Sequence, residues 1–212
     1  MIFYGKRVLF IGAHPDDIEL GAGALLHHIA PCSDVLCVTL SDNQQNPLLK
    51  TVVEEHYASM AALGVPKEKV ALGKFVTRNF PDARQEILEF MLKLRREFQP
   101  EVIFVHSRQD LHQDHNVVTD EALRAYRGIT LLGFDVIRSS NGFFPHFLVE
   151  VNEEDVNKKI EALSQYKTYA DKYYFGAELL RAINVRHGSL AERPFAEGFD
   201  ILRIVGRFEP CG

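Results

Sequence analysis

The chain of 212 residues contains few cysteines, no long basic run and no long apolar run, and each absence excludes a class of protein. Its three cysteines form no Cys-x-x-Cys pair, which argues against a disulfide framework and against a zinc site built from thiolates. The apolar runs are short and interrupted by charges, so we expect none of them to cross a membrane. Because the formal net charge is −5 and basic residues do not alternate with aromatic ones, we do not expect nucleic acid as a partner.

The N-terminal stretch MIFYGKRVLFIGAHPDD is apolar near its start, like a signal peptide. It has no small-residue cleavage site, however, and its apolar run continues directly into charged residues. We therefore interpret this stretch as the first strand of a cytoplasmic protein. The length fits one domain or, as the second possibility, two small ones, and 46% of the residues are hydrophobic. We expect residues 1–212 to form a single domain with a sizeable core.

Short apolar runs alternate with longer stretches of helical period along most of the chain. The pattern predicts strands at 6–13, 34–41, 69–75, 101–107, 146–151 and 199–206. It predicts helices at 21–30, 51–64, 82–100 and 116–128, and two more in series within 153–188. Asp82 is the expected N-cap of the third helix, and Gly64 is the expected C-cap of the second. This alternation favours an α/β fold, a Rossmann-like three-layer sandwich whose central sheet is mostly parallel.

Two groups of residues that commonly bind metals follow predicted strands directly. The motif AHPDDIELG, residues 13–21, places His14, Asp16 and Asp17 just after the first strand. The segment SRQDLHQDHN follows the fourth strand and supplies four more such residues: Asp110, His112, Asp114 and His115. In open parallel sheets, ligands bind beyond the carboxyl ends of the strands. We therefore expect the two groups to meet at one edge of the sheet.

Imidazole and carboxylate groups bind zinc, and they bind iron or manganese in related geometries. A catalytic zinc takes three protein ligands and keeps one position for water, whose pKa falls to about 7. A His–Asp pair from the first group and a histidine from the second would complete that set. The remaining carboxylate and imidazole groups could then serve as general base, acid or oxyanion partner. Each group alone is equally typical of helix caps and turns, and only their combination favours a metal site.

AHPDDIELG together with DLHQDHN resembles the signature of the LmbE-like (PIG-L) family of zinc-dependent N-acetylglucosamine deacetylases. MAALGV at the end of the second helix and AEGFDILRI near the C-terminus extend the resemblance over most of the chain. The sequence departs from the family pattern at Ser41 and Val52, in loops that we expect to contact the substrate. These departures concern the identity of the substrate and leave the metal chemistry intact.

The resemblance implies a divalent metal, Zn²⁺ or alternatively Fe²⁺, held by three residues: His14, Asp17 and His115. It implies that Asp16 is the general base that deprotonates the metal-bound water. His112 would polarise the amide carbonyl or protonate the leaving amine. Asp114, or Asp110, would hydrogen-bond a histidine and fix its tautomer. We also expect one of these carboxylates to lie beside His112 and to keep its imidazole protonated against the charge of the metal.

The implied reaction is removal of the N-acetyl group from an amino-sugar conjugate or a nucleotide sugar. Four residues are candidates for contact with this small-molecule substrate: Asp42, Arg78, Arg84 and Asn141. For the two arginines a solvated surface position is the ordinary role, whereas Asp42 and Asn141 lie on loops that we expect at the same edge of the sheet as the site. His106, at the end of the fourth strand, is expected either to support the site or to lie satisfied in the core.

Two other functions are compatible with the same residues. A set of two histidines and one carboxylate also occurs in non-haem iron oxygenases, which do not need Asp16 as a base. A catalytically silent sugar-binding protein could keep the metal site without releasing acetate. The sequence is also compatible with a homo-oligomer.

Overall fold

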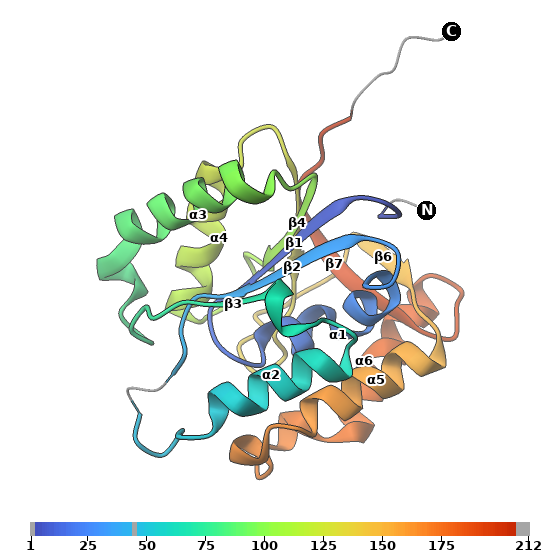
Figure 1. Cartoon of the computed structure of the whole chain (residues 1–212). Coiled ribbons are helices and arrows are strands. Elements are labelled where there is room, and N and C mark those ends of the chain that lie inside the picture. The colour runs from blue at the N-terminus through green and yellow to red at the C-terminus, as the bar shows by residue number, and fades with distance from the viewer. Residues whose placement is uncertain (1–2, 44–45, 207–212) are drawn as a thin grey trace, which may run out of the picture.

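The computed structural model describes residues 3–43 and 46–206 of the chain. At its centre lies one sheet of seven strands in the order β3-β2-β1-β4-β5-β7-β6 (Figure 1). The strands are β1 Arg7–Gly12, β2 Asp34–Thr39, β3 Val70–Leu72, β4 Val102–His106, β5 Thr130–Phe134, β6 Phe147–Glu150 and β7 Ala196–Arg203. The first five run parallel, and β7 runs antiparallel to both β5 and β6. This topology confirms the predicted α/β fold with a mostly parallel sheet.

Helices cover both faces of the sheet (Figure 1). They are α1 Asp17–Ile29, α2 Val52–Ala62, α3 Arg84–Phe98, α4 Gln113–Ala125, α5 Glu153–Leu163 and α6 Ala177–Leu190. Short 3₁₀ helices connect them: η1 Lys67–Lys69, η2 Phe80–Ala83, η3 Lys167–Tyr169 and η4 Tyr173–Phe175. On the face covered by α1, α2, α5 and α6, Val8 and Phe10 of β1 enter one hydrophobic core. On the face covered by α3 and α4, Leu9 and Ile11 enter the other. Burial on both faces is typical of a central parallel strand.

Some predicted elements differ from the structure. The sequence did not indicate β5, because TLLGF is short, contains Gly133 and shows no alternation. α1 begins at Asp17, not at residue 21, because the motif residues themselves form its first turn. The predicted cap at Asp82 is wrong: this residue lies within η2, and α3 begins only at Arg84. The predicted end of α2 is confirmed, since Gly64 follows it with a φ of +78°.

The order of the strands places β1 and β4 at the centre of the parallel part of the sheet. The chain leaves β1 toward α1 on one face and leaves β4 toward α4 on the other. Ligands bind at such a reversal in doubly wound sheets. Both predicted groups of site residues lie on these two connections. None of the helices in residues 3–43 and 46–206 combines the length and apolarity that a membrane span requires.

Candidate metal centre

The first group of site residues lies on a tight connection between β1 and α1. Gly12 ends the strand, and a Cβ atom there would lie 3.1 Å from the side chain of Ile18 and 3.2 Å from that of Asp17. Gly12 thus lets the first turn of α1 fold back close to the strand. Asp16 has a φ of 98°, a left-handed conformation that is strained for aspartate. Backbone strain of this kind concentrates at functional sites.

The second group lies between β4 and α4. His112 is the N-cap of α4, and its Nδ1 accepts a hydrogen bond from the backbone N–H of Asp114 at 3.1 Å. Asp114 and His115 follow in the first turn of the helix. Side chains of an α-helix lean toward its N-terminus, so these two point back toward the carboxyl edge of the sheet.

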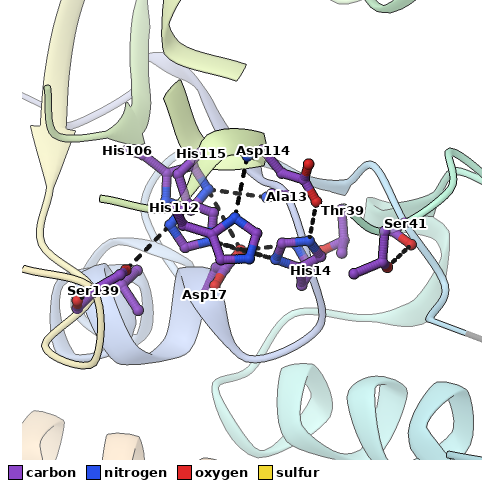
Figure 2. A network of polar contacts seen from close by, with 12 residues as sticks. Ala13, His14, Asp17, Thr39, Ser41, His106, His112, Asp114, His115 and Ser139 are labelled. Carbon is purple, nitrogen blue, oxygen red and sulfur yellow. Dashed lines mark hydrogen bonds and ion pairs between the residues drawn. The ribbon is translucent and has the colours of Figure 1, made fainter. Parts of the chain in front are cut away.

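Three acceptor atoms from the two groups converge at one point (Figure 2). His14 Nδ1 lies 3.3 Å from His115 Nε2 and 3.5 Å from Asp17 Oδ2. His115 Nε2 lies 3.4 Å from the same oxygen of Asp17. The three residues are between 2% and 8% exposed. We call these three atoms the acceptor triad.

Carboxylates determine which ring nitrogen of each histidine carries the proton. Asp114 Oδ2 lies 2.9 Å from His14 Nε2, and Asp110 Oδ2 lies 2.8 Å from His115 Nδ1. An ionised carboxylate only accepts hydrogen bonds, so the proton of each neutral imidazole sits on the nitrogen that faces it. His14 Nδ1 and His115 Nε2 then present lone pairs to each other and to Asp17. Lone pairs at this spacing repel one another unless a cation lies between them.

The two supporting carboxylates are held in turn by other donors. Asp114 accepts the backbone N–H of Arg78 at 2.6 Å. Asp110 accepts the backbone N–H of His112 at 2.8 Å and the hydroxyl of Ser139 at 2.9 Å. Carboxylates that orient histidines in this way are typical of metal sites. Asp110 and Asp114 each lie within hydrogen-bond distance of a different histidine ring, and the expectation that they fix the histidine tautomers stays a prediction.

Two other histidines border the triad and offer alternative groups of donor atoms. The groups His14–His112–His115 and Asp17–His106–His115 each bring three donor atoms within 4.8 Å of one another. His106 is completely buried and stacks on His115 with ring centroids 3.8 Å apart. Its Nε2 lies 3.4 Å from Asp17 but already accepts the backbone N–H of Ala13 at 3.0 Å. That nitrogen is therefore less available to a metal than the triad atoms.

The charges of the cluster shift the pKa values of its members. Burial lowers the pKa of His14, but hydrogen bonds to Asp114 and Asp17 outweigh burial and raise this pKa to about 9. Burial raises the pKa of Asp17, but the charges of His115, His106 and His14 outweigh burial and hold it far below its usual range. Both shifts mean that the cluster favours a positive charge among its carboxylates, which a proton or a metal ion can supply.

Asp16 is a buried carboxyl group directly before the triad residue Asp17. Burial, followed by the negative charge of Asp17, raises the pKa of Asp16 well above its usual range, and the charge of Arg138 acts against this rise. Burial, followed by the charge of Asp16, raises the pKa of both Tyr169 and Tyr174. The charge of Asp16 thus acts on Tyr169 and Tyr174, and the charge of Arg138 acts on Asp16.

The expectation that a carboxylate keeps His112 charged is wrong. Its Nδ1 accepts a backbone N–H, while Asp110 and Asp114 face the rings of His115 and His14. Burial, together with the charges of His115 and His14, lowers the pKa of His112 to about 4. His112 is therefore neutral at pH 7, with its proton on Nε2, and this nitrogen can donate a hydrogen bond.

Three of the predicted substrate residues lie on loops at the site. Arg78 and Asn141 have exposed side chains, and Asp42 is half-buried after β2. The backbone of Arg78 donates to Asp114, and the backbone N–H of Asn141 donates to the carbonyl of Gln109 at 2.8 Å. The structure therefore brings these loops to the carboxyl edge of the sheet, as expected.

Arg84 lies in different surroundings. It forms an ion pair of 2.6 Å with the completely buried Glu121 of α4 and one of 3.7 Å with Asp120. Arg124 binds the other oxygen of Glu121 at 2.6 Å. A buried carboxylate without a partner is costly, so Arg84 stabilises the contact between α3 and α4. This ion pair gives Arg84 a structural role between the two helices. A role of Arg84 in substrate binding stays a prediction.

The sequence did not indicate Arg138, Tyr169 or Asn43. The guanidinium carbon of Arg138 lies 5.8 Å from the ring centroid of Tyr174, and its charge acts on Asp16. The side-chain amide of Asn43 donates to the hydroxyl of Tyr169 at 3.3 Å. These residues come from distant segments and meet only in the fold, which is why no local pattern marks them.

Comparison with known proteins identifies the family to which this chain belongs. Residues 9–126, more than half of the chain and the part that carries both groups of site residues, match the PIG-L model, described as GlcNAc-PI de-N-acetylase. The chain belongs to the PIG-L family. A relative of this chain is the Escherichia coli K12 protein named "Uncharacterized deacetylase YaiS". That relative is 29% identical over 174 residues, which cover 77% of this chain and 91% of YaiS.

Solved structures share the fold of this PIG-L protein. N,N'-diacetylchitobiose deacetylase from Pyrococcus horikoshii matches with a TM-score of 0.72 at 20% identity, covering 93% of this chain and 84% of that one. The 4-carboxy-2-hydroxymuconate hydratase of Pseudomonas putida KT2440 matches with a TM-score of 0.73 at 18% identity, covering 96% and 100%. At such identities the likeness shows the fold alone. Because this fold serves both a deacetylase and a hydratase, the reaction has to be argued from the site residues.

Proposed function

We propose that this PIG-L protein is a zinc-dependent N-deacetylase that removes the acetyl group from an N-acetylglucosamine-type sugar conjugate. The observation that carries the proposal is the acceptor triad, whose histidine tautomers are fixed by two carboxylates. Membership in a deacetylase family supports hydrolysis of an acetylated amine.

The triad fits zinc by the chemistry of its donors. Two neutral imidazoles and one carboxylate form a set that a catalytic zinc commonly takes, and Fe²⁺ can take the same set. The residues that would hold the ion are His14, Asp17 and His115. When bound, zinc would supply Lewis acidity and lower the pKa of a water molecule.

Asp16 is the proposed general base. Its carboxylate takes a proton from the attacking water, and the resulting carboxylic acid can pass that proton to the leaving amine. The raised pKa of Asp16 brings the group toward the pH range in which a general base works best. Asp16 is only 9% exposed, which limits the access of bulk water to its carboxyl group.

His112 is the proposed donor to the carbonyl oxygen of the acetamide. An amide carbonyl is a poor electrophile, so the tetrahedral oxyanion has to be stabilised by hydrogen-bond donors. The backbone N–H of Asp114 holds Nδ1 of His112, which fixes the ring and leaves the protonated Nε2 for this donation. Asp114 itself acts as a positioning residue, because its carboxylate orients His14.

The proposed substrate is a small amino-sugar conjugate or a nucleotide sugar. Asp42, Arg78 and Asn141 are the candidates to hydrogen-bond its hydroxyl groups. Arg138 lies over the ring of Tyr174 and so places a cation next to an aromatic ring. Its guanidinium group could form charge-assisted hydrogen bonds with an anionic group on the conjugate. Membership in the PIG-L family, whose model is described as GlcNAc-PI de-N-acetylase, supports the choice of an N-acetylated sugar.

Acetate release from a panel of N-acetyl sugar conjugates and nucleotide sugars, with the metal content of the protein measured in parallel, tests the proposal. We expect one equivalent of zinc and metal-dependent release of acetate from at least one compound. A protein with bound metal that releases acetate from none of them would be a sugar-binding protein. An Asp16→Asn protein with full activity would instead favour the chemistry of a non-haem iron enzyme.

We also propose that the protein acts in the cytoplasm and that residues 1–212 act as a single domain. Cys32 and Cys37 are free thiols in the described structure, which suits a reducing compartment. Sedimentation analysis would establish whether the proposed enzyme is a homo-oligomer.

A further inference from the structure

The helix that carries Asp17 in its first turn is broken in the middle. Ala22, within α1, has φ −143° and ψ 17°, which are not helical values. In a continuous α-helix each amide donates to the carbonyl four residues earlier. Just after the break, the amides of Ala24 and Leu25 donate instead to the two carboxylate oxygens of Glu197, at 3.1 and 2.7 Å. Glu197 thus caps the second half of α1, where a negative charge is favourable.

Glu197 is buried in β7 and belongs to the stretch AEGFD, which takes no part in the proposed chemistry. Its Oε1 lies 2.6 Å from Nζ of Lys159 on α5, and both side chains are 3% exposed. A buried carboxylate without a counter-charge is strongly unfavourable. Lys159 supplies this counter-charge, and the two oxygens of Glu197 accept from the two amides.

Glycines bring both halves of α1 close to their neighbours. A Cβ atom on Gly21, before the break, would lie 2.3 Å from the ring of Phe134 in β5. A Cβ atom on Gly23, after the break, would lie 3.1 Å from Cγ of Lys159. The first half is thus fitted to the sheet and the second half to α5. A change in the angle between the halves would move the first turn relative to the end of β1.

We propose that Glu197, neutralised by Lys159, is a positioning residue for the active site. By capping the second half of α1, Glu197 fixes the geometry of the break at Ala22. The break in turn orients the start of the helix, with Asp16 and Asp17, toward the histidines of the triad. This inference rests on the proposed function in that Asp17 is taken as a metal ligand. It gives the buried carboxylate of Glu197 a role beyond stability.

The test uses the double variant Lys159→Met/Glu197→Gln. This change removes both charges at once and so avoids a buried unpaired ion, while the glutamine keeps the length of the side chain. Only one of its terminal atoms can accept, so one of the two amides loses its partner. Lys158→Met is the matched control, because this neighbouring lysine of α5 forms an exposed pair with Glu161.

Three quantities are measured on folded protein well below its thermal transition: the Kd for zinc, kcat and KM, and the hydrogen exchange of the Ala24 and Leu25 amides. We expect the double variant to lose roughly tenfold or more in zinc affinity and in kcat, the usual effect of losing a residue that supports metal ligands. KM should change little. One of the two amides should lose its protection, and the Lys158→Met control should match the wild type throughout.

Wild-type zinc affinity and kcat in the double variant, together with faster amide exchange, would overturn the proposal and leave the pair a purely structural role. If the double variant does not fold, Glu197→Asp takes its place, since it keeps the charge pair but shortens the reach of the carboxylate. Absence of acetate release by the wild type would contradict the proposed function. The zinc and exchange comparisons would still decide the positioning role.

Discussion

The centre and the rim of this site differ in how firmly their side chains are held. At the centre, His14, Asp17 and His115 are at most 8% exposed, and a carboxylate orients each of the two histidine rings. At the rim, the side chains of Arg78, Arg138 and Asn141 are exposed to solvent, and their loops follow β3 and β5.

This difference separates two functions within one site. Chemistry that depends on a fixed arrangement of charges requires the preorganised centre. Recognition of a substrate can depend on exposed loops, which tolerate sequence change more easily. Substitutions at the centre should therefore abolish the reaction, whereas substitutions at the rim should change which compound is accepted. The following predictions are ordered from the largest expected effect to the smallest.

The largest effect is expected from His14→Ala and His115→Ala. Each removes one of three proposed ligands, so both metal binding and acetate release should be almost completely lost. Metal analysis of the purified variants, with the exposed His146→Ala as control, measures the first effect. A full equivalent of zinc in both variants would show that the triad is not the metal site.

Asp16→Asn should keep its metal and lose roughly 10²- to 10⁴-fold in kcat, the range expected for a positioned general base. The two measurements together separate Asp16 from its neighbour Asp17. If Asp16→Asn lost the metal and Asp17→Asn kept it, the two aspartates would have exchanged roles.

His112→Ala should keep its metal and lose about 10²-fold or more in kcat, as expected for removal of one donor to an oxyanion. Because the pKa of His112 is lowered to about 4, the ring is neutral above that pH and loses no proton between pH 5 and 9. A nearby zinc ion would lower this pKa further. Any alkaline limb of the pH–rate profile should therefore persist in His112→Ala. Its selective loss in the variant would mean that the ring works as an imidazolium.

Arg138→Gln should have the smallest effect, and one limited to substrate choice. For a conjugate with an anionic group, loss of a charge-assisted hydrogen bond should raise KM about tenfold with little change in kcat. A neutral conjugate should show no change. Arg96→Gln, at an exposed arginine of α3, is the control. Equal effects on both conjugates would exclude the proposed contact with the anion.

Much of the centre could be predicted because it is encoded locally. His14, Asp16 and Asp17 are neighbours in sequence, and their place after a buried strand is visible as a pattern. The pairing of each carboxylate with a particular histidine is not local. Asp114 is two residues from His112, yet its oxygen reaches His14 across the sheet edge, so the charge state of His112 was predicted wrongly.

The rim and the support of α1 were beyond prediction for a similar reason. Arg138 follows β5, the strand that no pattern indicated, and its neighbour Tyr174 lies on a distant 3₁₀ helix. Glu197 and Ala24 are joined by a hydrogen bond between β7 and α1 that no local spacing reveals. Local patterns thus predicted most of the elements and the residue types of the candidate metal site, whereas long-range contacts determined how these side chains are oriented.

The central claim is that three particular atoms bind the metal. Anomalous X-ray diffraction at the zinc absorption edge, on crystals of the zinc-loaded protein, tests it most directly. We expect a single zinc ion bound by His14 Nδ1, Asp17 Oδ2 and His115 Nε2, with Zn–N distances of about 2.0–2.1 Å. A zinc ion bound instead by the alternative group of Asp17, His106 and His115, or located away from the triad, would contradict the account.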